Sequence, residues 1–147
     1  MKKGEIIKMY QELNAEISEF LAPLSKEEKS ADLNGKWSVN QNIDHLNKVL
    51  IPLNKALSKP KQGPAVAPEI YKANENLVLG TQDLEGTYQA LSLKFLKIVE
   101  RKWSEAQLDN YLLAHPLLGK LTIREILYFV HWHTNHHFEA IKKIRGN

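Results

Sequence analysis

Apolar residues recur at three- and four-residue steps in four long stretches of the chain, and this spacing predicts four amphipathic helices. The predicted helices span about residues 3–21, 39–57, 84–98 or 84–102, and 122–144. No segment alternates apolar and polar residues with enough β-branched content to predict a strand. The pattern therefore predicts an all-α fold, with the four helices packed as a four-helix bundle.

Hydroxyl residues followed three positions later by Glu or Gln predict where several helices begin. These pairs are Ser25 with Glu28 for one short turn, Ser38 with Gln41, Ser104 with Gln107, and Thr122 with Glu125. Thr81 or Asp83 can cap the third long helix, whose periodicity is interrupted only by Gly86. Pro52 cannot donate to the carbonyl of Lys48, so we expect a kink or an earlier end in the second long helix.

Residues 58–80 contain three prolines and two glycines and show no sustained periodicity. Connections of this length in a compact domain are usually loops that cover a functional site, or mobile segments. With Tyr71 and a few apolar residues as anchors, this one could lie across an end of the bundle.

The composition is that of an ordinary globular protein. The 147 residues are 43% hydrophobic and 25% charged, which suits one domain over residues 1–147. The formal charge of +3 is small and gives little support to a nucleic-acid partner. No window approaches the roughly 18 apolar residues of a membrane span, and the N-terminus lacks a signal-peptide pattern, so we expect a cytoplasmic protein.

The chain has no cysteine, so any metal site must use nitrogen or oxygen ligands. Four of the six histidines fall within residues 130–137. On a helical wheel, His133 and His137 project with the apolar stripe that includes Val130, whereas His131 and His136 lie toward its opposite edges. A pair at i and i+4 can share one metal ion, and the alternative is two core histidines bonded to backbone or water.

His45 lies on the second long helix, about 100° from the centre of its apolar stripe. Taken alone, this position is typical of a boundary or surface residue. The edge of a helix can nevertheless face a neighbouring helix across the seam of a bundle, so His45 stays a candidate third ligand.

Three motifs together resemble the DinB/YfiT-like superfamily, and the resemblance covers most of the chain. They are Trp37-Ser38 followed by His45-Leu46, the turn His115-Pro116-Leu117-Leu118-Gly119, and the segment His133-Thr134-Asn135-His136-His137. The resemblance implies an up-down-down-up four-helix bundle, often a homodimer, in which three histidines bind a divalent cation such as nickel or zinc. By position, it implies that His45, His133 and His137 are the ligands.

The same resemblance leaves the other three histidines outside the set of ligands. They are His115, His131 and His136. His115 precedes Pro116, and we expect it to shape the turn into the last helix.

Three imidazoles leave a coordination position open, as in catalytic metal sites. Water or a small-molecule substrate could fill it. Asp44 and Glu139 are the nearest carboxylates in the sequence, and we expect both to be solvated surface groups. Four aromatic residues could line a pocket, although such positions are more often part of a core: Trp37, Tyr71, Phe129 and Trp132.

The resemblance implies a metal-dependent enzyme, either a hydrolase or a transferase of a low-molecular-weight thiol. The alternative is a non-catalytic, dimeric stress-response or ligand-binding protein that retains the fold. No catalytic residue beyond the metal ligands is indicated by the sequence.

Overall fold

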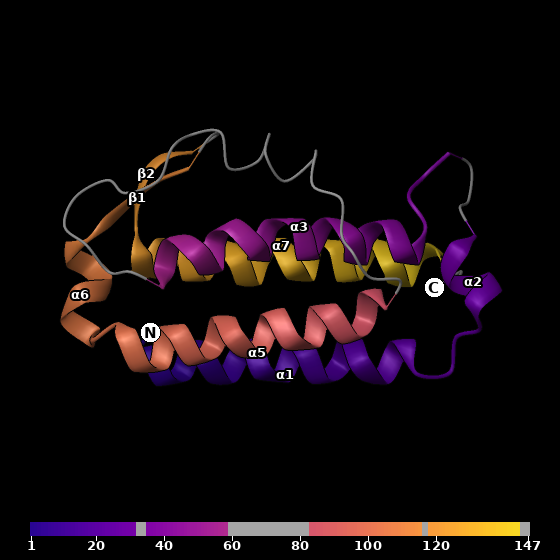
Figure 1. Cartoon of the computed structure of the whole chain (residues 1–147), viewed down its shortest axis with the longest axis horizontal. Coiled ribbons are helices and arrows are strands. Elements are labelled where there is room, and N and C mark those ends of the chain that lie inside the picture. Colours follow the sequence, from indigo (N-terminus) through magenta and orange to yellow (C-terminus); the bar gives the residue numbers. More distant parts are fainter. Residues whose placement is uncertain (32–34, 59–82, 116–117, 145–147) are drawn as a thin grey trace.

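Four long helices form the body of the computed structural model, which describes residues 1–31, 35–58, 83–115 and 118–144 (Figure 1). These helices are α1 (Lys3–Leu21), α3 (Val39–Leu57), α5 (Leu84–Lys102) and α7 (Ile123–Ile144). Two short helices, α2 (Lys26–Ser30) and α6 (Glu105–Asn110), lie at opposite ends of the bundle (Figure 1). The predicted positions of all four long helices are confirmed, and α5 extends to Lys102.

The long helices pack in a ring, in which α3 contacts α5 and α7, and α1 contacts α7 and α5. Figure 1 shows α1 and α7 running in one direction and α3 and α5 in the other. This is the up-down-down-up topology that the family resemblance implied. None of the helices in the described residues is long and apolar enough to cross a membrane.

Two buried asparagines fix the parallel register of α3 on α5. Asn47 Nδ2 donates to the Leu84 carbonyl at 3.1 Å, and Asn54 Nδ2 donates to the Leu91 carbonyl at 3.1 Å. Both donors and both acceptors are seven residues apart, so a slip of one helix turn would break both hydrogen bonds. Residues 59–82, which include nearly all of the loop predicted to lie across an end of the bundle, lie outside the described residues.

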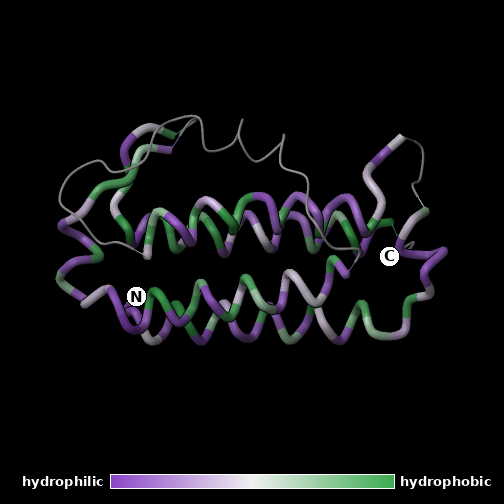
Figure 2. The backbone as a smooth tube through the Cα atoms, viewed as in Figure 1, coloured by the Kyte–Doolittle hydropathy of each residue, from purple (hydrophilic) through white to green (hydrophobic). Residues whose placement is uncertain are grey.

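The core is built from the apolar stripes of all four long helices. Figure 2 shows hydrophobic positions recurring along each of them. At the centre, the rings of Tyr10 on α1 and Phe95 on α5 lie 5.3 Å apart, and both residues are buried. Trp103, directly after α5, is buried too and donates from Nε1 to the Leu57 carbonyl at 2.9 Å, which ties the ends of α3 and α5 together.

The capping pairs predicted from the sequence are present. At the start of α3, Ser38 Oγ accepts from Gln41 N at 3.1 Å and Gln41 Oε1 accepts from Ser38 N at 2.8 Å. The equivalent hydrogen bonds occur at Ser25, Ser104 and Thr122.

Asp83 caps α5 by accepting from Gly86 N at 2.9 Å. A Cβ atom at position 86 would lie 2.1 Å from Asp83 Oδ2, so the glycine makes room for the cap. Pro52 was expected to cause a kink or an earlier end of α3. The helix continues past it to Leu57, so the earlier end is ruled out and the kink stays a prediction.

A short β-hairpin precedes α7, and the expectation of no strands was wrong at this place. β1 (Leu112–His115) pairs antiparallel with β2 (Gly119–Thr122). Four-residue strands are too short for a period-two pattern to stand out in the sequence. Gly119, at φ +78°, supplies the left-handed conformation that the turn requires. The hairpin stands where α7 begins (Figure 1).

Candidate metal centre

Three histidines from two antiparallel helices come together at the seam between α3 and α7. His45 Nε2 lies 3.3 Å from His133 Nε2. The potential ligand atoms of His45, His133 and His137 all lie within 4.8 Å of one another. The structure therefore juxtaposes the three residues that the family resemblance implied.

The helical wheel predicted that His133 and His137 point at the core, but in the structure they do not point at its centre. Thr134 and Phe138 occupy that position and are buried, whereas His133 and His137 are half-buried on the side that faces α3. Thr134 is polar, so the spacing of apolar residues does not reveal that it lies on the buried face of α7. His45 lies half-buried at the helix edge, where the wheel placed it.

Asn42 orients the imidazole of His137. Its side chain is 3% exposed, and its Nδ2 donates to the Ser38 carbonyl at 2.9 Å. That bond directs Oδ1 toward His137 Nδ1, 2.8 Å away. Because Oδ1 can only accept, Nδ1 of His137 carries the proton and donates it, which leaves the lone pair on Nε2. Asn42 thus gives His137 the tautomer that a metal ligand needs.

Burial keeps His133 and His137 neutral. Loss of solvent, followed by the neighbouring imidazoles of His137 and His45, lowers the pKa of His133 from 6.5 to about 3. Burial and then His45 lower the pKa of His137 from 6.5 to about 4. Both side chains are therefore uncharged at neutral pH, with lone pairs available to a cation.

The donor set fits a divalent transition metal. Neutral imidazoles suit zinc, copper, iron and nickel, and the chain has no cysteine to compete for the ion. Two imidazole nitrogens bound tetrahedrally at about 2.05 Å would lie about 3.3 Å apart. The distance of 3.3 Å between the Nε2 atoms of His45 and His133 agrees with that separation.

Aromatic rings pack against the three histidines from both ends. The ring of Trp37 lies 5.3 Å from that of His45 and is stacked at 6.1 Å on His137. Phe129 is stacked on His133 at 5.6 Å. Two of the four aromatic candidates thus border the site. Trp132 is 59% exposed and stacks on His136, and Tyr71 lies outside the described residues.

The remaining histidines stand apart from the cluster of ligand atoms. His115 Nδ1 accepts from Leu118 N at 3.0 Å across the hairpin turn, in keeping with the predicted role in shaping that turn. Its ring also lies 4.6 Å from that of Phe129. His131 is half-buried, and burial lowers its pKa. His136 is exposed.

The two carboxylates nearest in sequence are held in ion pairs along their own helices. Asp44 pairs with Lys48 at 2.8 Å, and Glu139 pairs with Lys142 at 2.7 Å. Both pairs are at least partly exposed, as expected of surface carboxylates.

Sequence reasoning missed Asn42. Its signal was its position three residues before His45, because residues at i and i+3 share a helix face, and here that face is turned to α7.

The sequence model of the DinB superfamily matches residues 9–141. The chain belongs to the DinB superfamily. Among solved structures, it is similar to YfiT from Bacillus subtilis, described as a probable metal-dependent hydrolase with an unusual four-helix bundle topology. The two share 19% sequence identity with a TM-score of 0.73, over 97% of this chain and 85% of YfiT. No protein of curated function matches this DinB-superfamily chain significantly.

Proposed function

We propose that this protein binds one divalent metal ion through His45, His133 and His137 and is a metal-dependent hydrolase of a small molecule. The observation that carries the proposal is the cluster of three ligand atoms within 4.8 Å, with two Nε2 atoms at the separation that one metal ion requires. The similarity to YfiT, a probable metal-dependent hydrolase, supports the choice of reaction.

The residues of the chain provide binding and orientation. His133 and His137 are neutral because burial lowers the pKa of each, and Asn42 fixes the ring of His137. Three protein ligands leave at least one coordination position for water or substrate. A divalent ion held there supplies Lewis-acid chemistry, either by polarising a substrate oxygen or by lowering the pKa of a water molecule.

The aromatic rings around the histidines limit access to them. Phe129 covers one face of His133, and Trp37 covers His137 and part of His45. Because Trp37 is itself 44% exposed, the substrate reaches the histidines on the solvent side of the α3–α7 seam. Asp44 and Glu139 are engaged in ion pairs, so neither is assigned to proton transfer.

Hydrolysis by protein of defined metal content tests the proposal. Untagged protein is stripped with EDTA, reloaded separately with zinc, nickel and manganese, and assayed on a panel of small esters and amides. We expect hydrolysis only after reloading, and its loss in His45→Gln and His133→Gln. His131→Gln is the matched control on α7 and should retain activity. Equal hydrolysis by stripped protein, or by His45→Gln, would refute the proposal.

Three finer expectations stay predictions from the family resemblance. They are the identity of the metal as nickel or zinc, transfer of a low-molecular-weight thiol, and a homodimer. The reloading experiment ranks the metals, and the same preparations assayed with a thiol and an alkylating electrophile distinguish thiol transfer from hydrolysis. Sedimentation equilibrium of the purified chain measures the oligomeric state.

A further inference from the structure

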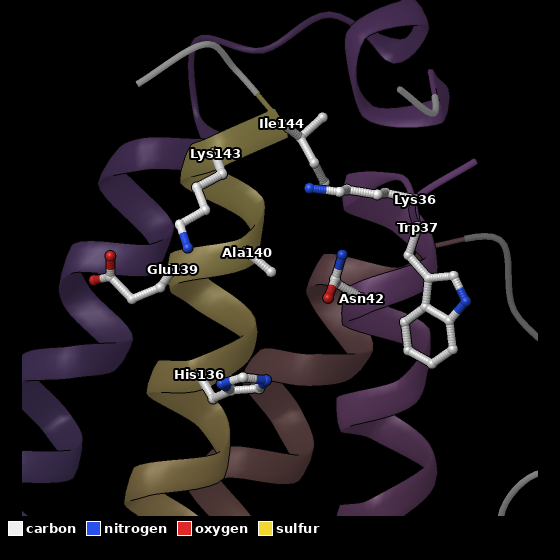
Figure 3. Close-up of a pocket in the computed structure, with 8 residues that line it drawn as sticks. All are labelled: Lys36, Trp37, Asn42, His136, Glu139, Ala140, Lys143 and Ile144. Carbon is white, nitrogen blue, oxygen red and sulfur yellow. The ribbon is translucent and has the colours of Figure 1, made fainter. Parts of the chain in front are cut away.

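A pocket of about 370 Å³ adjoins the three histidines. It lies between the residues that lead into α3 and the last two turns of α7 (Figure 3). Asn42, which holds His137, forms part of its wall. Trp37 belongs to both places, because it lines the pocket and packs on the rings of His45 and His137. A molecule in the pocket would therefore lie beside the candidate metal centre.

The charged side chains of the pocket favour an anion. Lys36 and Lys143 both line it, and neither forms an ion pair with another residue in the described part of the chain. Figure 3 shows Lys36 reaching from the start of α3 toward the last turn of α7. Glu139 also lines the pocket, but it pairs with Lys142 at 2.7 Å, and its carboxylate is turned away from Asn42 (Figure 3).

The helix dipoles do not change this balance. The positive N-terminal end of α3 and the negative C-terminal end of α7 both reach the pocket, so their fields oppose each other. The side-chain charges therefore decide the preference. Two ammonium groups that pair with no carboxylate of the described residues outweigh one carboxylate that already pairs with Lys142.

Besides these charged residues and Asn42, the pocket is lined by His136 and by three largely apolar side chains. The partly exposed ring of Trp37 and the side chains of Ala140 and Ile144 offer an aromatic and an aliphatic surface. The lining thus matches a small molecule with an apolar body and one anionic group. A pocket of this volume falls within the range of small-molecule sites.

We propose that this pocket binds the carboxylate or phosphate group of an amphiphilic small molecule, and that it selects anionic substrates for the adjoining histidine site. The second half of this statement rests on the proposed function. The binding half stands without it, because the pocket and its lysines do not depend on a metal ion.

Titration of metal-free protein with three small molecules that share a phenyl ring tests the binding. The probes are benzoate, phenyl phosphate and neutral benzamide, followed through the indole N–H resonance of Trp37 and the side-chain amide of Asn42. We expect one or both anions to shift these signals and to bind roughly tenfold more tightly than benzamide, because a hydrogen bond from an ammonium group is stronger when its acceptor is charged. The tighter of the two anions identifies the group as carboxylate or phosphate.

Lys36→Gln and Lys143→Gln should each weaken anion binding several-fold and leave benzamide unaffected. Lys94→Gln, an exposed lysine on α5, is the matched control and should bind like the wild type. Equal affinity for benzamide and both anions, wild-type affinity in Lys36→Gln, or shifts confined to other residues would overturn the proposal.

Zinc affinity measured on the same variants separates this proposal from the proposed function. Lys36→Gln should bind zinc like the wild type. If the wild type binds anions but no metal, the proposed function fails and the pocket stands. If it binds metal but shows no preference for anions, the pocket proposal fails and the metal site stands.

Discussion

Asn42 holds His137 through one 2.8 Å hydrogen bond, and its own amide is held by the Ser38 carbonyl. A chain of two hydrogen bonds therefore links the first turn of α3 to a candidate metal ligand on α7. Such outer partners raise metal affinity by fixing the tautomer and orientation of the ligand, although they never touch the ion.

Replacing Asn42 should weaken metal binding without preventing folding. In Asn42→Leu, His137 loses the acceptor that fixes its tautomer, and we expect zinc affinity to fall about 10- to 100-fold. Competition with a chromogenic chelator measures the affinity. Asn47→Leu is the matched control, since it removes another buried asparagine of α3 that bonds to α5 instead. Equal zinc affinity in Asn42→Leu and the wild type would contradict the assigned role.

The pKa values of His133 and His137 predict how metal-free protein responds to pH. Each folded-state pKa, about 3 and about 4, lies below the unfolded value near 6.5, so the unfolded chain binds more protons between these limits. Stability is therefore complete above pH 6.5 and falls as the pH is lowered toward 4. Urea unfolding in EDTA at pH 8, 6 and 4.5 measures this slope.

The double variant His133→Gln/His137→Gln supplies the comparison for that slope. It lacks both titrating groups, so its stability should fall less between pH 6.5 and 4.5. An identical slope in the variant and the wild type would show that other groups dominate the acid response.

How far single residues could be predicted differs within the site. His133 and His137 follow from their i, i+4 spacing, whereas His45 followed from the family motif, because its wheel position alone indicates a boundary residue. Lys36 could not be found in the sequence, and the only signal for Asn42 was its position three residues before His45. Their roles depend on which neighbouring helix each side chain faces, and helical periodicity carries no information about neighbours.

At the scale of elements, the start of α3 matters most, because it places Asn42 and His45 opposite α7. Ser38 caps this helix and is 4% exposed. Removing the cap leaves donors of the first turn unsatisfied, and the turn that carries Asn42 becomes less ordered.

Ser38→Ala should lower the free energy of unfolding by about 1 kcal/mol. Ser25→Ala removes the same kind of cap from α2, which has no buried residue, so its effect should be smaller. Urea unfolding of zinc-free protein measures both. We also expect weaker zinc binding in Ser38→Ala alone. Equal stability losses in the two variants would contradict the importance given to the start of α3.

The long helices were predictable because each has an apolar stripe, and α3 and α7 also begin with a capping pair. The hairpin of β1 and β2 was not, since its strands are four residues long. The direction of α5 was not predictable from periodicity either. An amphipathic stripe looks the same whether a helix runs parallel or antiparallel to its neighbour, so the order of the bundle followed from the family resemblance.

At the scale of the whole molecule, a metal ion at the α3–α7 seam would link the N-terminal half of the chain to its last helix. His45 lies 88 residues from His133 in sequence, so the ion would close a long loop. An ion that binds only the folded state stabilises it in proportion to the logarithm of its concentration.

Zinc at about 100 times its dissociation constant should therefore stabilise the fold by about 2.7 kcal/mol. For a chain of this size, the melting temperature should rise by roughly 5–10 °C. Calorimetry of stripped protein with and without zinc measures the rise. In His137→Ala, zinc should raise the melting temperature little or not at all. His136 is the exposed neighbour of His137, and His136→Ala should show the same rise as the wild type.

The most direct test of the central claim is an anomalous-scattering map from crystals of protein purified without a histidine tag and loaded with zinc. The account predicts one peak per chain, about 2.0–2.1 Å from the Nε2 atoms of His45, His133 and His137. It also predicts that Nδ1 of His137 still donates to Asn42. No peak among the three histidines at saturating zinc, or a peak at Nδ1 of His137, would contradict it.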